Sequence, residues 1–136
     1  MPGSFFDTNV LVYLASTDPE KASRARELLR AGGTISVQVL NEAANVMRRK
    51  LQFSWPETLD FLSSIRGLLS VRPITLRIHE AGLALSERYG LAVYDGMIAA
   101  AALDSGCDTL WSEDMQDGMV IDARLTVVNP FRLGKG

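Results

Sequence analysis

The chain has 136 residues, of which 47% are hydrophobic and 22% are charged. That length predicts a single domain over residues 1–136, with a core large enough to fold without a metal or disulfide staple. The 14 Lys and Arg residues against 16 Asp and Glu residues give a formal net charge of -2, which excludes a uniformly basic nucleic-acid coat.

Cysteine and histidine each occur once, as Cys107 and His79. A single cysteine excludes an internal disulfide and a cysteine-rich zinc site. Catalysis by two histidines is excluded, and a Ser-His-Asp triad would have to use His79, which lies in an ordinary amphipathic stretch. Because no apolar run approaches the length of about 20 residues that crosses a bilayer, and residues 1–4 do not resemble a secretion signal, we expect a cytoplasmic protein without membrane contact.

Short apolar runs alternate with longer amphipathic stretches along the chain. Strands are predicted at residues 4–6, 34–37, 71–74, 108–112 and 126–128. Helices are predicted from about residue 9 and at residues 19–30, 40–51, 76–89 and 95–104, with another after the capping-box residues 54–57. This alternation predicts an α/β fold in which a parallel sheet carries helices on both faces.

Four acidic residues occupy positions of one kind. Asp7 closes the first predicted strand, Glu42 lies early in a helix, Asp95 opens a helix, and Asp114 follows a buried strand. The carboxyl ends of parallel strands and the adjacent helix starts share one edge of the sheet, where ligands bind. Like charges brought close together raise each other's pKa or require a cation. With oxygen ligands and no nearby His or Cys, the expected ion is Mg²⁺ or Mn²⁺ rather than zinc.

Each of these acids also has an ordinary structural interpretation. Asp7 and Asp95 both suit the N-cap of a helix. Glu42 is compatible with a helix surface, although its apolar neighbours place it at the margin of a buried face, where an unpaired carboxylate is costly. Asp114 is compatible with a solvated loop.

The near-zero net charge conceals two poles. Residues 89–123 contain seven acids and no Lys or Arg, whereas residues 20–50 contain seven bases and three acids. If the acidic segment holds a divalent ion next to the basic segment, both can contact the negative charges of a bound polyanion. Arg49 follows Glu42 by seven residues, on nearly the same helical face, and is therefore the candidate for positioning a substrate. A solvated helix surface is the alternative, and it is favoured for the bases within residues 24–30.

The segments Phe6–Asn9, Tyr94–Leu103 and Ser112–Asp114, together with Glu42, resemble the PIN-domain ribonucleases over almost the whole chain. More narrowly, they resemble the VapC-like toxins of toxin-antitoxin pairs. The resemblance implies a three-layer α/β/α fold with a short, mainly parallel central sheet. It also implies a Mg²⁺- or Mn²⁺-dependent endoribonuclease. The implied catalytic residues are Asp7, Glu42, Asp95 and Asp114, and the implied metal ligands are Asp7, Asp95 and Asp114.

The same resemblance implies supporting residues. Thr8 and Asn9 match the polar pair after the first acid, and Ser112 stands where threonine is frequent. Asp117 is close enough in sequence either to support the metal ligands without touching the ion or to replace Asp114 as the fourth acid.

Partners are implied as well: an RNA substrate, a second copy of the chain in a homodimer, and a small antitoxin that inserts a segment near the acidic groove. The apolar cluster of Met47, Leu51, Phe53 and Trp55 is predicted to form part of the antitoxin contact, with core packing as the competing explanation.

Other functional classes are less compatible with the sequence. A haloacid-dehalogenase-like phosphatase would use Asp7 as its nucleophile, but it needs a second Asp two residues later, where Asn9 stands. Its usual lysine partner is missing, since residues 51–134 contain no lysine. A receiver-like signalling module lacks the same lysine. A catalytically silent PIN-like scaffold that binds a partner remains open.

Overall fold

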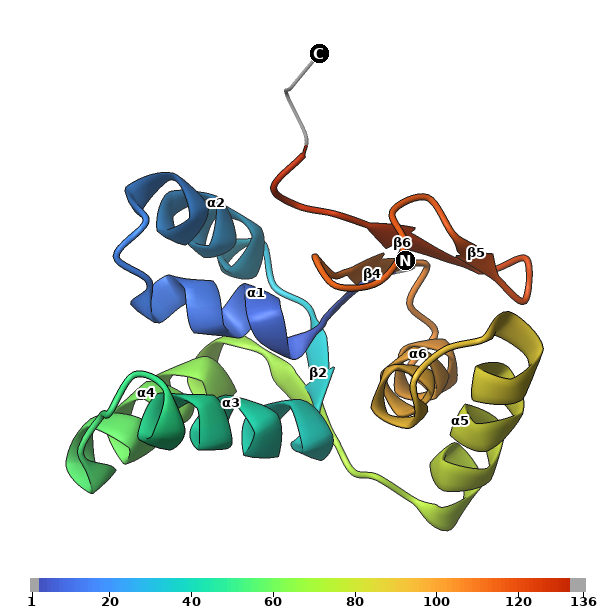
Figure 1. The fold of residues 1–136 in the computed structure, drawn as a ribbon, viewed down its shortest axis with the longest axis horizontal. Coiled ribbons are helices and arrows are strands. Elements are labelled where there is room, and N and C mark those ends of the chain that lie inside the picture. The colour runs from blue at the N-terminus through green and yellow to red at the C-terminus, as the bar shows by residue number, and fades with distance from the viewer. Residues whose placement is uncertain (1–2, 133–136) are drawn as a thin grey trace.

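A computed structural model describes residues 3–132 (Figure 1). The strands are β1 (Ser4–Phe6), β2 (Thr34–Ser36), β3 (Ser70–Arg72), β4 (Thr109–Trp111), β5 (Val120–Ile121) and β6 (Leu125–Val128). The helices are α1 (Thr8–Val12), α2 (Pro19–Arg30), α3 (Val37–Arg49), α4 (Trp55–Leu68), α5 (Leu76–Tyr89) and α6 (Val93–Asp104), and the 3-10 helix η1 (Tyr13–Ala15) follows α1. The strands form one sheet in the order β3-β2-β1-β4-β6-β5, in which every pairing is parallel except that between β5 and β6. Helices α1 to α4 gather on one side of β1 and β2, and α5 and α6 lie on the other (Figure 1). The predicted three-layer α/β/α fold with a mainly parallel sheet is confirmed.

The centre of the sheet places the ends of β1 and β4 side by side. Phe6 pairs with Trp111 at the carboxyl ends of these strands, and the Asp7 N–H continues the ladder by donating to the Trp111 carbonyl at 2.9 Å. The Ser112 N–H donates to the Val128 carbonyl of β6 at 3.0 Å. Because the strands are parallel, the residues that follow them emerge at one edge of the sheet.

Helices α5 and α6 pack unusually closely because small residues face each other. A Cβ atom on Gly96 would lie 2.5 Å from the Gly82 carbonyl oxygen and would overlap the Ser86 hydroxyl. A Cβ atom on Gly82 would lie 2.5 Å from the sulfur of Met97. The run Gly96–Ala102 is buried throughout, so α6 lies between α5 and the sheet. The four consecutive alanines at residues 99–102 therefore allow α6 to pack closely against its neighbours.

Helix ends follow the local chemistry of the sequence. Asp18 caps α2 ahead of Pro19, and Ser54 and Glu57 form the predicted capping box of α4. Gly90 ends α5 in the left-handed conformation, with φ 68°. The predicted capping box and the predicted bounds of the helices at residues 19–30 and 76–89 are confirmed.

Helices α3 and α6 begin at Val37 and Val93, two or three residues earlier than predicted, and two strands differ from the sequence-based expectation. Strand β3 ends at Arg72 instead of residue 74, because Pro73 has no N–H to donate to the ladder. Strand β5 was not predicted at all. It is joined to β6 through Asp122 and Ala123, both with positive φ, and this pair lacks the glycine that marks most such turns.

The unpredicted turn is held from α5. The Tyr89 hydroxyl accepts the N–H of Asp122 at 2.8 Å, and Arg88 donates to the Asp122 carboxylate at 2.8 Å. These contacts offset the strain of two non-glycine residues in the left-handed region.

Two further features concern the described residues 3–132. None of their helices is long and apolar enough to span a membrane. Cys107, between α6 and β4, is only 6% exposed, and burial raises the pKa of its thiol.

Candidate active site

Asp7 lies at the carboxyl end of β1, and its side chain is almost completely buried, with 4% exposed. One carboxylate oxygen accepts the Thr8 N–H at 2.7 Å and so caps α1. The other accepts the Ser112 hydroxyl at 2.6 Å and, more weakly, the Asn9 amide at 3.3 Å. The N-cap interpretation of Asp7 is confirmed. The same carboxylate also faces the acidic edge, since two other acids influence its pKa.

The ionisation of Asp7 shows how unfavourable this environment is for a charge. Burial raises the pKa of Asp7 from 3.8 to about 6, although the hydrogen bonds from Ser112 and Thr8 oppose the rise. Repulsion from Asp95 and Asp114 raises it further. A nearby cation that neutralises the negative charge would stabilise the ionised form of such a carboxyl group.

Glu42 projects from α3 and is held by two polar side chains. The Thr8 hydroxyl donates to one carboxylate oxygen at 2.6 Å, and the Gln38 amide donates to the other at 3.1 Å. The same Gln38 amide also donates to the Tyr94 carbonyl at 3.1 Å, which connects α3 to the first turn of α6. Gln38 was not among the residues proposed from sequence. Its spacing of four residues from Glu42, one helical turn, is the signal that would have indicated it.

Asp95 is the third residue of α6 and not its cap. The N-cap position is Ala92, with no side-chain cap, so the N-cap interpretation of Asp95 is wrong. Burial raises the pKa of Asp95, and repulsion from Asp114 and then Glu42 adds to the rise. Within residues 3–132, no hydrogen-bond donor contributes to stabilising the Asp95 carboxylate. The half-buried charge therefore has no counterpart in the described chain.

Asp114 reaches the acidic edge through Asn9. The Asn9 amide donates to the Asp114 carboxylate at 3.1 Å, and the Asn9 carbonyl accepts the Glu113 N–H at 3.2 Å. Asp117 instead accepts the N–H of Asn129, after β6, at 2.8 Å. Only Asp114 of these two acids influences the pKa of Asp7 and Asp95, so the geometry favours it as the fourth acid.

The four acids approach one another without closing around a single point. Among the described residues, no three His, Cys, Asp or Glu side chains converge closely enough to hold a metal ion as they stand. Three neutral donors, Thr8, Asn9 and Ser112, each donate a hydrogen bond to a carboxylate oxygen of this group. The all-oxygen donor set and the unneutralised carboxylates fit a hard divalent cation.

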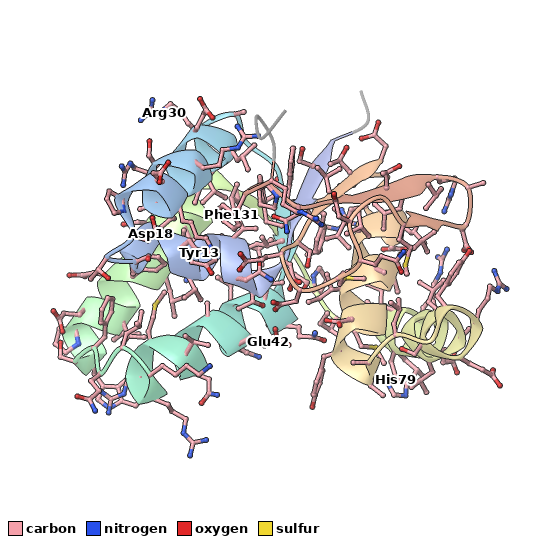
Figure 2. The ribbon with its side chains drawn as sticks, turned by 45° about the horizontal axis from the view of Figure 1, so that its top comes forward. Tyr13, Asp18, Arg30, Glu42, His79 and Phe131 are labelled. Atoms are coloured by element: carbon pink, nitrogen blue, oxygen red, sulfur yellow. The ribbon has the colours of Figure 1, made fainter. Side chains whose placement is uncertain are left out.

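A second network, which the sequence did not reveal, secures the loop that carries Asp114. The Tyr13 hydroxyl and the Lys21 ammonium each donate to the Glu113 carboxylate at 2.7 Å. Lys21 also donates to the Tyr13 hydroxyl at 3.0 Å, and these two bonds hold the pKa of Lys21 above its usual value. The Phe131 ring packs edge-on against Tyr13, with centroids 4.7 Å apart (Figure 2). Three parts of the chain therefore meet behind the acidic edge.

A pocket of about 660 Å³ opens beside the acids, between α1, η1 and α3. Glu42 and Asp114 lie among its lining residues, and so does Lys50. Arg49, the predicted substrate-positioning residue, is exposed and does not line this pocket. Its role stays a prediction.

Other residues singled out in the sequence have structural contacts. Arg24 donates to the Pro130 carbonyl at 3.0 Å and pairs with Glu27 at 2.6 Å. His79 is exposed on α5 and well separated from Glu42 (Figure 2), so it takes no part in the acidic edge.

The apolar cluster divides between core and surface. Met47 is fully buried, which confirms core packing for this residue, whereas Trp55 is 59% exposed. Leu51 and Phe53 are partly accessible.

The fold and the acidic edge together define a PIN-type α/β domain. The family model of the PIN domain matches residues 4–116, and the chain belongs to this family, whose members are generally nucleases. The match supports this class over a phosphatase or a receiver module. No curated protein matches the sequence significantly.

Solved structures share the fold. A toxin-antitoxin complex from Klebsiella pneumoniae has 23% identity and a TM-score of 0.72, covering 93% of this chain and 97% of that one. VapC20 of Mycobacterium tuberculosis, a toxin that cleaves the sarcin-ricin loop, has 17% identity and a TM-score of 0.68, covering 82% and 89%. VapBC2 of Rickettsia felis, bound to a DNA fragment from its promoter, has 22% identity and a TM-score of 0.68, covering 93% and 97%. At these identities the similarity shows the fold alone.

Proposed function

We propose that the chain is a Mg²⁺- or Mn²⁺-dependent endoribonuclease, and that it is the toxin of a toxin-antitoxin pair. Its catalytic carboxylates are Asp7, Glu42, Asp95 and Asp114. The observation that carries the proposal is the state of Asp95: a half-buried carboxylate, repelled by Asp114 and Glu42, with no hydrogen-bond donor in the described chain to stabilise it. Such a group needs a cation, and a cation at this edge suits a phosphodiester substrate.

Three carboxylates are assigned to the ion. Asp7, Asp95 and Asp114 come from the end of β1, the start of α6 and the loop after β4. A bound Mg²⁺ or Mn²⁺ supplies charge stabilisation at the scissile phosphate and a water of lowered pKa. The Asn9 amide donates to one oxygen of the Asp114 carboxylate and leaves the other free of any hydrogen bond within the described residues.

The remaining residues orient the reacting groups. Ser112 and Thr8 fix the two oxygens of Asp7, so that carboxylate cannot rotate freely. Thr8 and Gln38 fix Glu42 in the same way, which suits it to hold an attacking water or a second ion. Burial, and then the negative charge of Asp114 and Glu42, raise the pKa of Asp95, which makes this carboxylate a better proton acceptor than an isolated aspartate.

The proposed partners are an antitoxin and a second copy of the chain. Structures of similar fold include a toxin-antitoxin complex and VapBC2, which support this assignment. The exposed Trp55 and the accessible Leu51 are the part of the apolar cluster available to an antitoxin. We place the protein in the cytoplasm, where RNA is its substrate.

The decisive experiment compares Asp95→Asn with Asp60→Asn, which removes an exposed carboxylate from α4. Purified proteins are incubated with total RNA in Mg²⁺, in Mn²⁺ and in EDTA. We expect cleavage by wild type and by Asp60→Asn in either metal, and none by Asp95→Asn or in EDTA. Cleavage that persists in EDTA, or in the folded Asp95→Asn variant, would refute the assignment.

Expression in cells separates a toxin from a silent scaffold. We expect wild type to arrest growth and Asp95→Asn to relieve the arrest. A folded wild-type protein that neither cleaves RNA nor slows growth would identify a binding scaffold instead.

A further inference from the structure

The pocket of about 660 Å³ beside the acids has two chemically different ends. Glu42 and Asp114 lie at one end. Lys50 lies eight residues beyond Glu42 along α3, a distance of about 12 Å along the helix axis. A ligand that spans the pocket therefore meets the acidic edge at one end and a cation at the other.

The walls between the two ends are mixed. Val12, Val46 and Leu51 supply apolar surface, while Asn45 and Tyr13 supply polar groups. A flat aromatic ring with polar edges matches such walls, because its faces pack on aliphatic groups and its edges take hydrogen bonds. The pocket volume of about 660 Å³ lies near the middle of the range of about 300 to 1,000 Å³ for small-ligand pockets and is large enough for one nucleotide.

Lys50 stands at the turn after α3 and belongs to the lining of the pocket. Lys50 caps the helix through its N–H, which donates to the Val46 carbonyl at 2.8 Å, and Gln52 then turns the chain with φ 56°. Arg48 secures the turn by donating to the Phe53 carbonyl at 2.7 Å, with its guanidinium 4.2 Å from the centre of the Trp55 ring. The Arg48 side chain is therefore already engaged in contacts that hold this turn.

Among the residues that the structure describes, the Lys50 side chain has no such partner, in contrast to Arg48. No ion pair within residues 3–132 includes the Lys50 ammonium. Its charge is therefore available to an anion that enters the pocket.

We infer that this pocket binds the nucleotide adjacent to the scissile phosphodiester of a single-stranded RNA. The inference rests on the proposed function. The phosphate of that nucleotide pairs with Lys50, and the base lies against Val46 and Leu51 with its edge towards Asn45. Charge complementarity supports this occupant, because a polyanion bridges a metal-loaded acidic edge and a lysine, whereas an acidic or apolar peptide satisfies only one of them.

Binding is tested on the wild-type protein in Mg²⁺, so that the acidic edge carries its ion, and cleavage plays no part because nucleoside monophosphates contain no phosphodiester bond. The four nucleoside 5′-monophosphates are titrated while backbone amide resonances are recorded, with ribose 5-phosphate as the probe that lacks a base. We expect saturable shifts at Val46, Leu51 and Asn45, with tighter binding of at least one nucleotide than of ribose 5-phosphate. Shifts confined to other surfaces, or equal affinity for ribose 5-phosphate, would overturn the inference.

A matched pair of variants tests Lys50. Lys50→Met removes the charge in the pocket, and Arg66→Met removes a charge from the exposed face of α4. For binding of a short single-stranded RNA, we expect Lys50→Met to reduce the salt dependence, log Kd against log salt, by about 0.7, as expected for one lost phosphate contact. Arg66→Met should leave the slope unchanged, and Lys50→Arg should restore it. Equal slopes for Lys50→Met and wild type would contradict the assignment.

The kinetic readout separates this inference from the proposed function. Where wild type cleaves RNA, Lys50→Met should raise KM several-fold with little change in kcat, because a contact made equally in the ground and transition states affects binding alone. If wild type shows no nuclease activity but nucleotide binding in the pocket persists, the proposed function fails while the binding site stands. Nuclease activity without nucleotide binding in the pocket would support the proposed function and overturn this inference.

Discussion

The acidic edge and the α5–α6 pair are neighbours in the fold and differ in what their packing achieves. Between α5 and α6, Gly82 and Gly96 let two helices touch, and the run Gly96–Ala102 is buried throughout. At the acidic edge, burial raises the pKa of Asp7 and Asp95, and the carboxylates repel one another. One region stabilises the protein and the other carries a free-energy cost, which is the usual condition of a functional site.

The two regions meet at one peptide bond. Asp95 belongs to the acidic edge, and Gly96 beside it belongs to the helix contact. The close approach of α5 and α6 therefore fixes where Asp95 stands relative to Glu42 and Asp114. Changes in the two regions should have opposite effects on stability, and four predictions test this contrast.

The largest effect is expected from Asp7→Asn. If Asp7 is a metal ligand as proposed, the substitution should reduce metal-dependent cleavage by about a thousandfold, because the ligand and its charge are lost. In EDTA at pH 7 it should also raise the free energy of unfolding by about 1 to 2 kcal/mol, since a buried charge is removed. Urea denaturation and an RNA cleavage assay measure the two quantities. Asp108→Asn, an exposed carboxylate, is the control, and a less stable Asp7→Asn protein would contradict the contrast.

The pH dependence of stability in EDTA should follow Asp7. Its pKa is about 6 in the folded protein against 3.8 ordinarily, so between these values the folded state binds more protons than the unfolded state. The free energy of unfolding should therefore fall as the pH rises from about 4 to 6, by up to about 3 kcal/mol. Urea midpoints across this range check the sign. Asp7→Asn should flatten the profile, and an increase of wild-type stability over this interval would show that Asp7 does not control it.

Gly96→Ala tests the stabilising region. Its Cβ would lie 2.5 Å from the Gly82 carbonyl oxygen, so the helices must separate, at a cost of about 2 kcal/mol in the free energy of unfolding. Cleavage should fall as well, because Asp95 moves with the backbone. Gly67→Ala is the matched control, since nothing lies within 4 Å of a Cβ at that helical position, and it should stabilise α4 by about 0.5 to 1 kcal/mol. Thermal unfolding of both variants distinguishes close packing from a general effect of alanine.

The smallest effect concerns the network behind the acids. Lys21→Met should lower the free energy of unfolding by about 1 kcal/mol, because the ion pair with Glu113 is only partly shielded from solvent. A double-mutant cycle with Glu113→Gln should show coupling between the two residues, and cleavage should decrease several-fold as the loop carrying Asp114 loosens. Additive effects of the two substitutions would show that the pair acts independently.

Local chemistry determined most of the fold, which is why the sequence could predict it. Pro19 after Asp18, the Ser54–Glu57 box and Gly90 each act within a few residues of the element that they start or stop. The turn at Asp122 could not be predicted, because its partners lie on α5, more than 30 residues away.

The site shows the same division. One rule, that strand ends and the adjacent helix starts share an edge, predicted that the four acids approach one another, and in the structure they lie close enough to raise the pKa of Asp7 and Asp95. The same rule could not identify residues that act through side-chain contacts. Lys21 and Glu113 are 92 residues apart, and Gln38 matters only because the Tyr94 carbonyl lies within its reach.

Cys107 provides an intrinsic reporter of local opening at the end of α6. Its thiol is enclosed where α6 leads into β4, next to the helix that carries Asp95. An alkylating reagent can modify this sulfur only when that connection opens, so the rate of modification measures local opening without an introduced label. If Mg²⁺ binds at the acidic edge and slows the alkylation, the decrease in rate would measure how strongly the ion restricts local opening of α6.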